Sequence, residues 1–182
     1  AYNYENVRLN KGEIRRKDIV YNYRYAGGDV TIYKMTGKQL KDYMEWAADY
    51  FDTIQPGDTE YRYNDERAGR KYVTFDIFGG VKYKIDLRNE KGNKITNLML
   101  VNGKKITSEM ELKVGMNAYR FEQLARKGGI FDGQEIPVLW ASKEAIGEID
   151  GTIQNMMIDY IRNVKNGVIE GKSHNNWEII GL

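Results

Sequence analysis

The sequence has no cysteine and a single histidine among its 182 residues. Without cysteine it can form neither disulfides nor cysteine-ligated zinc sites, and it has no thiol nucleophile. His174 cannot by itself supply the several ligands of a two-metal phosphohydrolase centre. A catalytic triad would pair His174 with Ser108, Ser142 or Ser173, and none of these serines lies in a Gly-x-Ser-x-Gly elbow. We therefore expect no catalytic residues and no metal site in this chain, which disfavours an independent hydrolase.

Long apolar runs and an excess of one charge are also missing. No apolar run approaches the ~18 residues that a membrane span needs, so we expect none. Lys and Arg number 28 against 26 Asp and Glu, and a net charge of +2 argues against a nucleic acid polymer as the main partner. The absence of cysteine fits an exported bacterial protein. Because the sequence starts at Ala1 without a signal segment, we expect a piece of a longer polypeptide.

Two apolar stripes at helical spacing predict the principal helices. Before the first stripe, Thr36 and Gln39 have the spacing of a capping box, with Thr36 at the N-cap. The expected buried face of this helix consists of Leu40, Tyr43, Met44, Ala47 and Phe51. The second stripe consists of Ile153, Met156, Met157, Tyr160, Ile161 and Val164. Gly167 has the position of a C-terminal cap, and we expect the second stripe to lie in the core as well.

Segments rich in β-branched and aromatic residues, separated by turn signals, predict the strands. We expect strands at residues 30–35, 71–78, 81–87, 95–101, 112–117, 137–142 and 175–182. The polar residues 55–69 predict an exposed loop, and residues 16–23 fit either a short helix or an extended stretch. Together these elements predict a single compact α+β domain over residues 1–182, with a mixed β-sheet and two principal helices.

Two groups of residues suggest a small-molecule site. In the first, residues 21–28, tyrosines that include Tyr23 and Tyr25 run into Gly27 and Gly28 just before a predicted strand. A glycine pair lets backbone approach a ligand closely, and a neighbouring ring offers a stacking face. The alternative interpretation is a half-buried edge segment with a glycine turn.

The second group follows the predicted strand at residues 112–117. Asn117, Tyr119 and Arg120 are followed by a further glycine pair and Phe131. A ring and a cation at a loop mouth suit a nucleobase, whose π face can stack on the ring. The alternative is that Tyr119 is a core residue and Arg120 a surface charge. Arg8, in a basic stretch near the start, could grip an anion or belong to a solvated face.

Four blocks, in order along nearly the whole chain, resemble the C-terminal domain of the 5'-nucleotidase family. The resemblance is closer to the branch with 2',3'-cyclic-nucleotide 2'-phosphodiesterase/3'-nucleotidase activity. The blocks are Gly12-Glu13-Ile14 with Asp18-Ile19; residues 35–42 with Glu45-Trp46-Ala47; Tyr72 and Phe75-Asp76 with residues 80–87; and Asn102-Gly103-Lys104 with residues 116–120 and Asn176-Trp177.

The resemblance implies a nucleoside- or nucleotide-binding domain whose partner is an N-terminal catalytic domain of the same chain. That metallophosphoesterase domain would hold two divalent metal ions, whereas this domain would hold no cofactor and would bind the base between two aromatic rings. Tyr119 matches one ring position through its Asn-x-Tyr-Arg segment. Ala26 falls on the other ring position and Gly28 where the family has Asn, so the neighbouring Tyr25 is the expected second ring. Arg8 lies near an anion-contacting arginine of the family.

The resemblance also carries expectations about location and about an alternative function. It implies an exported bacterial protein located outside the cell, in the cell wall or in the periplasm. Ile130 stands where some members have a ribose-binding Asp, and residues 121–127 separate the Tyr-Arg segment from its glycine pair. The alternative function is a non-catalytic binding or interaction module that keeps the fold but has lost base recognition.

Overall fold

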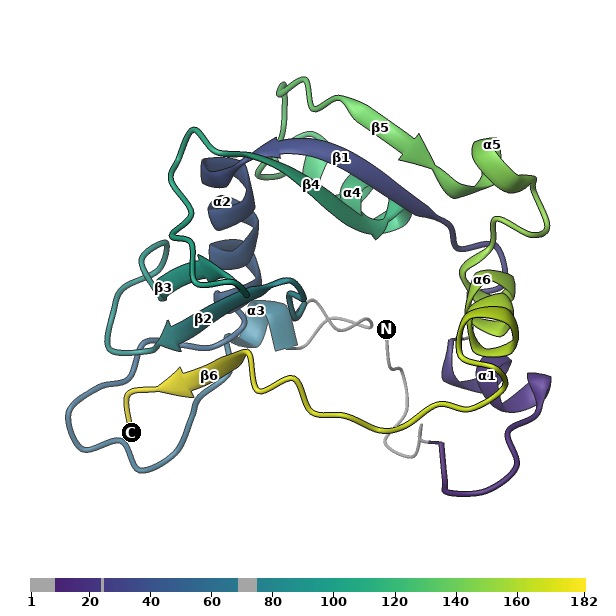
Figure 1. The fold of residues 1–182 in the computed structure, drawn as a ribbon. Helices are drawn as coiled ribbons and strands as arrows, with labels where there is room; N and C mark the ends of the chain where they lie inside the picture. The colour runs from purple at the N-terminus through teal and green to yellow at the C-terminus, as the bar shows by residue number, and fades with distance from the viewer. Residues whose placement is uncertain (1–8, 24, 69–74) are drawn as a thin grey trace. The chain divides into compact units, whose positions relative to one another are not determined.

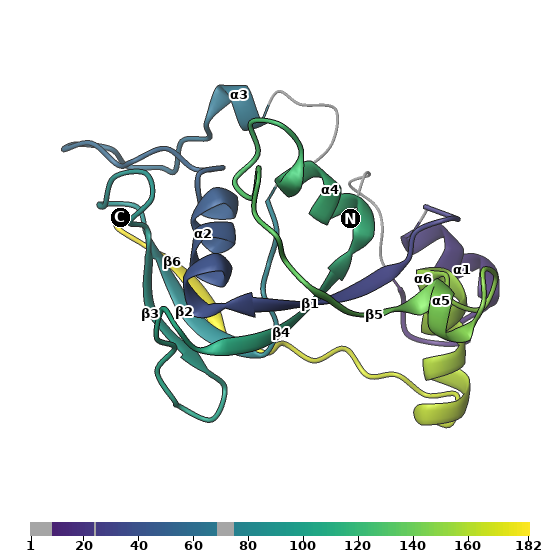
Figure 2. The ribbon, with the colours of Figure 1, turned by 90° about the horizontal axis from the view of Figure 1, so that it is seen from above.

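The computed structural model describes residues 9–23, 25–68 and 75–182 (Figures 1 and 2). Contacts between residues divide the chain into two compact units. Unit 1 comprises Ala1–Lys34 and Lys113–Lys172, and unit 2 comprises Met35–Leu112 and Ser173–Leu182. The described residues form two three-stranded sheets and several helices. The α+β class predicted from the sequence is thereby confirmed.

Helix α2 (Gly37–Ala48) begins where the sequence predicts it. The Thr36 hydroxyl accepts a hydrogen bond from the Gln39 backbone N–H at 3.2 Å, and the Gln39 side-chain oxygen accepts one from the Thr36 N–H at 2.9 Å. This reciprocal capping box satisfies two backbone donors that the helix start would otherwise leave unpaired. The predicted apolar stripe is buried: Leu40, Tyr43, Met44, Ala47 and Phe51 are each at most 6% exposed.

The sheet of unit 2 packs its alternating apolar face in the core with α2. Strand β2 (Val81–Asp86) is central, antiparallel to β3 (Ile95–Leu100) and parallel to β6 (Trp177–Ile180). Val81, Tyr83, Ile85 and Leu87 are buried, as their period of two predicts. Figure 1 shows α2 beside the β2–β3 pair, so helix and sheet together form the interior of unit 2.

Gly37 is required by a close backbone approach at the start of α2. An added Cβ would lie 2.0 Å from the carbonyl oxygen of Thr107. The backbone N–H groups of Gly37 and Lys38 donate to the carbonyls of Met110 and Ser108, at 2.8 and 2.9 Å. The connection after β3 therefore lies directly against the helix start, with no room for a side chain at position 37.

A buried carboxylate links α2 to the start of β3. Glu45 is 8% exposed, and its two oxygens accept hydrogen bonds from the backbone N–H groups of Lys94 and Ile95 at 2.8 and 2.9 Å. Lys94 is 2% exposed, and its ammonium group donates to the carbonyl of Phe51. Burial raises the pKa of Glu45, against the opposing effect of the two backbone donors.

The sheet of unit 1 has β1 at its centre. Strand β1 (Val30–Thr36) lies between β4 (Glu111–Asn117) and the antiparallel β5 (Val138–Ala141), and both β1 and β4 continue into unit 2. Helix α4 (Ala118–Ala125) packs on this sheet: the Phe121 ring stacks on Tyr33 with centroids 3.8 Å apart. Figures 1 and 2 both show α4 on one side of the three strands.

The second predicted helix forms, but the prediction that its apolar stripe lies in the core is wrong. Helix α6 (Ile153–Asp159) continues into a π-helical turn, η1 (Tyr160–Val164), and none of their residues is buried. Tyr160 is 48% and Val164 61% exposed. The π turn disrupts the alignment of residues four apart, and α6 packs on α1 (Arg16–Asn22), which has seven residues. Gly167 ends the helix as predicted, with φ 79°.

Other local predictions had mixed outcomes. Within residues 16–23, Arg16–Asn22 form the helix α1, and the predicted exposed loop contains the short helix α3 (Asp65–Ala68). Of the strand expected at residues 71–78, residues 71–74 lie outside the described part of the chain and residues 75–78 are not a strand. The helices α4 and α5 (Ser142–Ile146) were not predicted. Both are short and directly follow strands, so local periodicity carried little signal for them.

Candidate functional site

Tyr23 joins two segments of unit 1 that are far apart in the sequence. The side-chain amide nitrogen of Asn117, 94 positions away, donates a hydrogen bond to the Tyr23 hydroxyl oxygen. The Tyr25 ring meets the Tyr23 ring edge to face, with centroids 5.6 Å apart. The bond and the ring contact bring the first predicted group of residues together with the second.

Gly28, the second residue of the glycine pair, lies directly beneath Tyr23. The N–H of Gly28 donates to the carbonyl of Tyr25 at 3.0 Å, which closes a turn before β1. A Cβ added to Gly28 would lie 2.5 Å from the Tyr23 hydroxyl oxygen, whereas one added to Gly27 would meet nothing within 4 Å. Gly28 is therefore small because the Tyr23 ring covers it, and Gly27 leaves exposed backbone beside the turn.

The start of α4 presents an aromatic ring to solvent. Asn117 caps this helix, and its side-chain oxygen accepts a hydrogen bond from the N–H of Tyr119 at 2.9 Å. The N–H of Ala118 donates to the carbonyl of Asp29 at 3.3 Å, which ties the helix start to the glycine turn. Tyr119 is 58% exposed. The alternative interpretation of Tyr119 as a core residue is therefore wrong.

The chain after β5 holds the glycine turn from its other side. The N–H of Ile153 donates to the carbonyl of Gly28 at 2.8 Å, and the side-chain amide of Gln154 donates to the carbonyl of Tyr23 at 2.6 Å. The fully buried Ser142 hydroxyl accepts from the N–H of Val30 and donates to the carbonyl of Gly151. These bonds fix the backbone of the segment that carries the Tyr23 and Tyr25 side chains.

The remaining predicted site residues lie in different surroundings. Phe131 is 1% exposed, with its ring centroid 6.3 Å from that of Phe121, so it lies in the core of unit 1. Arg120 is half-buried on α4, next to Tyr119. Arg8 lies outside the described residues. The structure thus connects Tyr25, Gly28, Asn117 and the backbone of Tyr119 through Tyr23, a member of the first predicted group that was not chosen as a site residue.

Burial raises the pKa of Tyr23, and the neighbouring Tyr25 and Asp29 act in the same direction. The hydrogen bond from Asn117 opposes this rise. Because an unperturbed tyrosine ionises near pH 10, a raised pKa keeps the phenol of Tyr23 protonated at neutral pH. It can therefore act as a hydrogen-bond donor.

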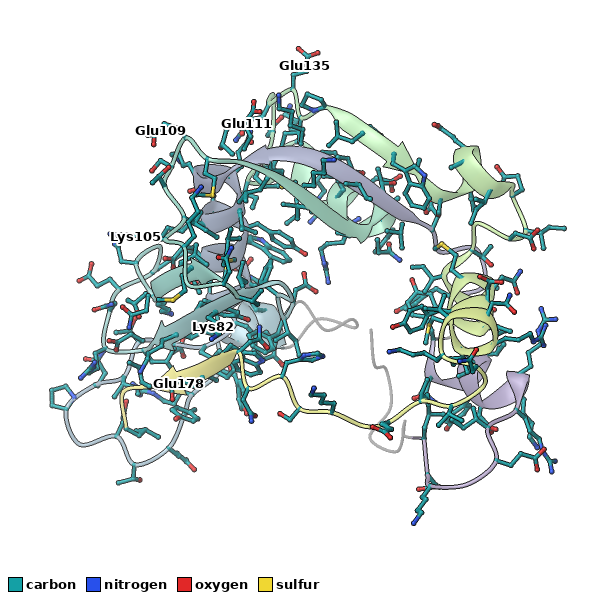
Figure 3. All side chains as sticks on the ribbon, viewed as in Figure 1. Lys82, Lys105, Glu109, Glu111, Glu135 and Glu178 are labelled. Atoms are coloured by element: carbon teal, nitrogen blue, oxygen red, sulfur yellow. The ribbon has the colours of Figure 1, made fainter. Side chains whose placement is uncertain are left out.

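Unit 2 carries an open groove of about 540 Å³ on its sheet. Its lining residues are Lys82, Tyr83, Lys84, Asn97, Met99, Asn175, Asn176, Trp177 and Glu178. Figure 3 labels Lys82 on β2 and Glu178 on β6. The ammonium of Lys84 pairs with the carboxylate of Glu178 at 2.6 Å, so two of the charges in the groove neutralise one another.

Within residues 9–23, 25–68 and 75–182, no three His, Cys, Asp or Glu side chains come together in a way that could hold a metal ion. In the same part of the chain, no helix has the length and apolar character needed to cross a membrane.

Comparison with known proteins identifies the family. A family model described as "5'-nucleotidase, C-terminal domain" matches residues 1–126. The chain belongs to this family. Its C-terminal third, which includes α6, lies outside the matched region. The matched region includes α2, the central strands β1 and β2 of the two sheets, and the residues from Tyr23 to Tyr119.

Two curated relatives of this nucleotidase-family chain are bacterial phosphoesterases. It is 25% identical over 189 residues to the 2',3'-cyclic-nucleotide 2'-phosphodiesterase/3'-nucleotidase of Haemophilus influenzae, covering 96% of this chain and 27% of that protein. It is 32% identical over 183 residues to the trifunctional nucleotide phosphoesterase protein YfkN of Bacillus subtilis, covering 92% of this chain and 11% of that protein. The chain thus spans about a quarter or less of the relatives' lengths.

Solved structures show the same fold. A Staphylococcus aureus protein described as a 5'-nucleotidase, in complex with alpha-ketoglutarate, superposes with a TM-score of 0.69 and 22% identity, over 90% of this chain and 29% of that one. A 5'-nucleotidase precursor from Thermus thermophilus gives a TM-score of 0.61 and 13% identity, over 93% of this chain and 28% of that one. At these identities the likeness establishes the fold of the nucleotidase C-terminal domain.

Proposed function

We propose that this chain binds the nucleoside part of a nucleotide and sets the substrate specificity of a phosphoesterase of the 5'-nucleotidase family. The observation that carries the proposal is the Tyr119 ring. It is 58% exposed, and its backbone is fixed at the start of α4 by the Asn117 cap. An exposed ring on an ordered backbone offers a stacking face for a base at little further cost in ordering.

Tyr25 supplies the second ring in this proposal. It is half-buried beside Tyr23, on the turn whose carbonyl at Asp29 bonds to the α4 start. Gly27 leaves backbone next to Tyr25 where a ligand edge can approach, whereas Gly28 lies under Tyr23. Asn117 orders the α4 start, and Phe131 supports α4 from the core. Arg120, beside Tyr119, and Arg8 remain predicted contacts for ligand oxygen or phosphate.

The proposal assigns hydrolysis to another domain of the same polypeptide. The resemblance implies an N-terminal metallophosphoesterase domain with two divalent metal ions, and the bacterial relatives are several times longer than this chain. In this proposal the other domain hydrolyses the phosphoester and unit 1 binds the nucleoside. The same resemblance supports an exported bacterial protein, located outside the cell, in the cell wall or in the periplasm.

Substitution of Tyr119 tests the proposal. Stacking on one ring contributes roughly 1–3 kcal/mol, so Tyr119→Ala should weaken binding of adenosine and 3'-AMP by about one to two powers of ten. Tyr119→Phe keeps the ring and should bind almost as wild type. Chemical-shift titration of the 182-residue chain suits the expected weak affinity.

Tyr160→Ala is the matched control, because Tyr160 is also a partly exposed tyrosine of unit 1 but lies on η1. It should leave the affinity unchanged. If Tyr119→Ala and Tyr160→Ala bind equally, or if wild type shows no shifts at millimolar ligand, the proposal fails. The alternative, an interaction module without base recognition, then gains support from Ala26 and Gly28 at the family's site positions.

A further inference from the structure

The orientation of the Asn117 side chain is fixed by a group that can only donate. The backbone N–H of Tyr119 lies 2.9 Å from the Asn117 side-chain oxygen. Since an N–H has no acceptor capacity, the oxygen of the amide must face Tyr119, and the NH₂ group must face Tyr23. The Tyr23 hydroxyl therefore acts as the acceptor in its bond with Asn117.

A phenol that accepts one hydrogen bond still has its own proton to donate. Among the described residues, Tyr23 makes no hydrogen bond through which this proton is donated. The raised pKa of Tyr23 keeps the proton in place at neutral pH. The Tyr23 side chain is half-buried, so part of it stays open to a ligand.

The position of this hydroxyl relates it to the proposed stacking ring. One amide group, that of Asn117, contacts both the Tyr23 hydroxyl and the backbone N–H of Tyr119. The same hydroxyl lies over Gly28, where an added Cβ would come within 2.5 Å of it. The hydroxyl thus occupies the space that a side chain at position 28 would need, next to the backbone that carries Tyr119.

We infer that Tyr23 is a specificity-determining residue, whose hydroxyl donates a hydrogen bond to an acceptor atom on the edge of the bound base. The inference rests on the proposed nucleoside-binding function and extends it to the group that reads the base. A ring nitrogen or carbonyl oxygen in the plane of the base is the matching partner. Asn117 is a positioning residue, because its side chain holds both the Tyr23 hydroxyl and the backbone of Tyr119.

The test combines Tyr23→Phe with analogues that lack one acceptor each. Adenosine has three ring-nitrogen acceptors, and the 1-deaza, 3-deaza and 7-deaza analogues remove them one at a time. Wild type should bind one analogue about three- to tenfold more weakly than adenosine, as expected for the loss of one neutral hydrogen bond. Tyr23→Phe should bind adenosine more weakly by a similar factor and lose the discrimination against that analogue. Tyr160→Phe is the matched control and should keep the wild-type pattern.

A second variant displaces the Tyr23 hydroxyl without changing Tyr23 itself. Gly28→Ala introduces a Cβ that must displace the Tyr23 hydroxyl, so it should also lose discrimination among the analogues. Gly171→Ala, in unit 1 with nothing within 4 Å of its added Cβ, should not. Thermal midpoints of all variants identify any that fail to fold.

The outcomes separate this inference from the proposed function. If Tyr23→Phe binds all four nucleosides as wild type does, or weakens all four equally, Tyr23 does not read the base and the inference is overturned, while the loss caused by Tyr119→Ala still upholds the proposed function. If wild type binds none of the nucleosides, the proposed function fails and the inference fails with it.

Discussion

The two units use their aromatic and polar side chains in different ways. In unit 2, Tyr43, Phe51 and Tyr83 are buried between α2 and its sheet, and the polar atoms of Glu45 are satisfied within the core. In unit 1, Tyr119 is largely exposed, and Tyr23 is half-buried with a proton that can still be donated. Under the proposed function, unit 1 carries the recognition surface and unit 2 is its support.

The difference has a physical basis. Complete burial and complete hydrogen bonding stabilise a core, because apolar area leaves water and no polar group is orphaned. A binding site needs the opposite at a few positions, since an exposed ring or an unused donor is what a ligand can contact. Unit 1 limits the cost by fixing the backbone around these groups through Asn117, Gln154 and Ser142.

The largest expected effect is on the stability of unit 2. Leu40 is 4% exposed in the core face of α2, so Leu40→Ala should lower the free energy of unfolding by about 2–5 kcal/mol. Val164→Ala, on η1 in unit 1, shortens a side chain that is 61% exposed. This substitution should change the free energy of unfolding by less than about 0.5 kcal/mol. Denaturant unfolding of both variants measures the contrast. Equal losses would contradict the distinction between a packed and an unpacked helix face.

A smaller effect concerns pH. Burial raises the folded-state pKa of Glu45 above its ordinary value of 4.5, so its contribution to stability is fully present below about pH 4.5 and is lost as the pH rises through the folded-state pKa. Glu45→Gln cannot titrate, so relative to this variant wild type should lose stability as the pH rises from about 4.5. Unfolding curves across this range measure the slope. If the stability of Glu45→Gln changes with pH in parallel with that of wild type, the raised pKa of Glu45 is contradicted.

The sequence predicted the core of unit 2 well because that core depends on local periodicity. Thr36 and Gln39 stand three residues apart, as a capping box requires, and Val81 to Leu87 alternate with a period of two. Both signals lie within a dozen residues of sequence. The π turn at Tyr160, by contrast, changes the helical period partway through the second stripe, and no local sequence pattern predicted this turn.

The candidate site was predictable in part. Tyr25, Gly28, Asn117 and Tyr119 were chosen from local composition and from the family resemblance, and the structure connects them. Tyr23 lies in the same tyrosine-rich segment but was not singled out, because its role depends on a hydrogen bond to a residue 94 positions away. Phe131 was chosen for its glycine neighbours, yet it packs in the core, since local sequence does not reveal which way a ring turns.

The central claim is that nucleoside recognition belongs to unit 1. The most direct measurement is a titration of the 182-residue chain with adenosine and 3'-AMP, following the assigned backbone amide shifts of both units. The account predicts saturable changes at Tyr25, Gly28 and Tyr119, with no change at Asn97 and Trp177 in the groove of unit 2. Shifts concentrated in that groove, or no shifts at millimolar ligand, would contradict it.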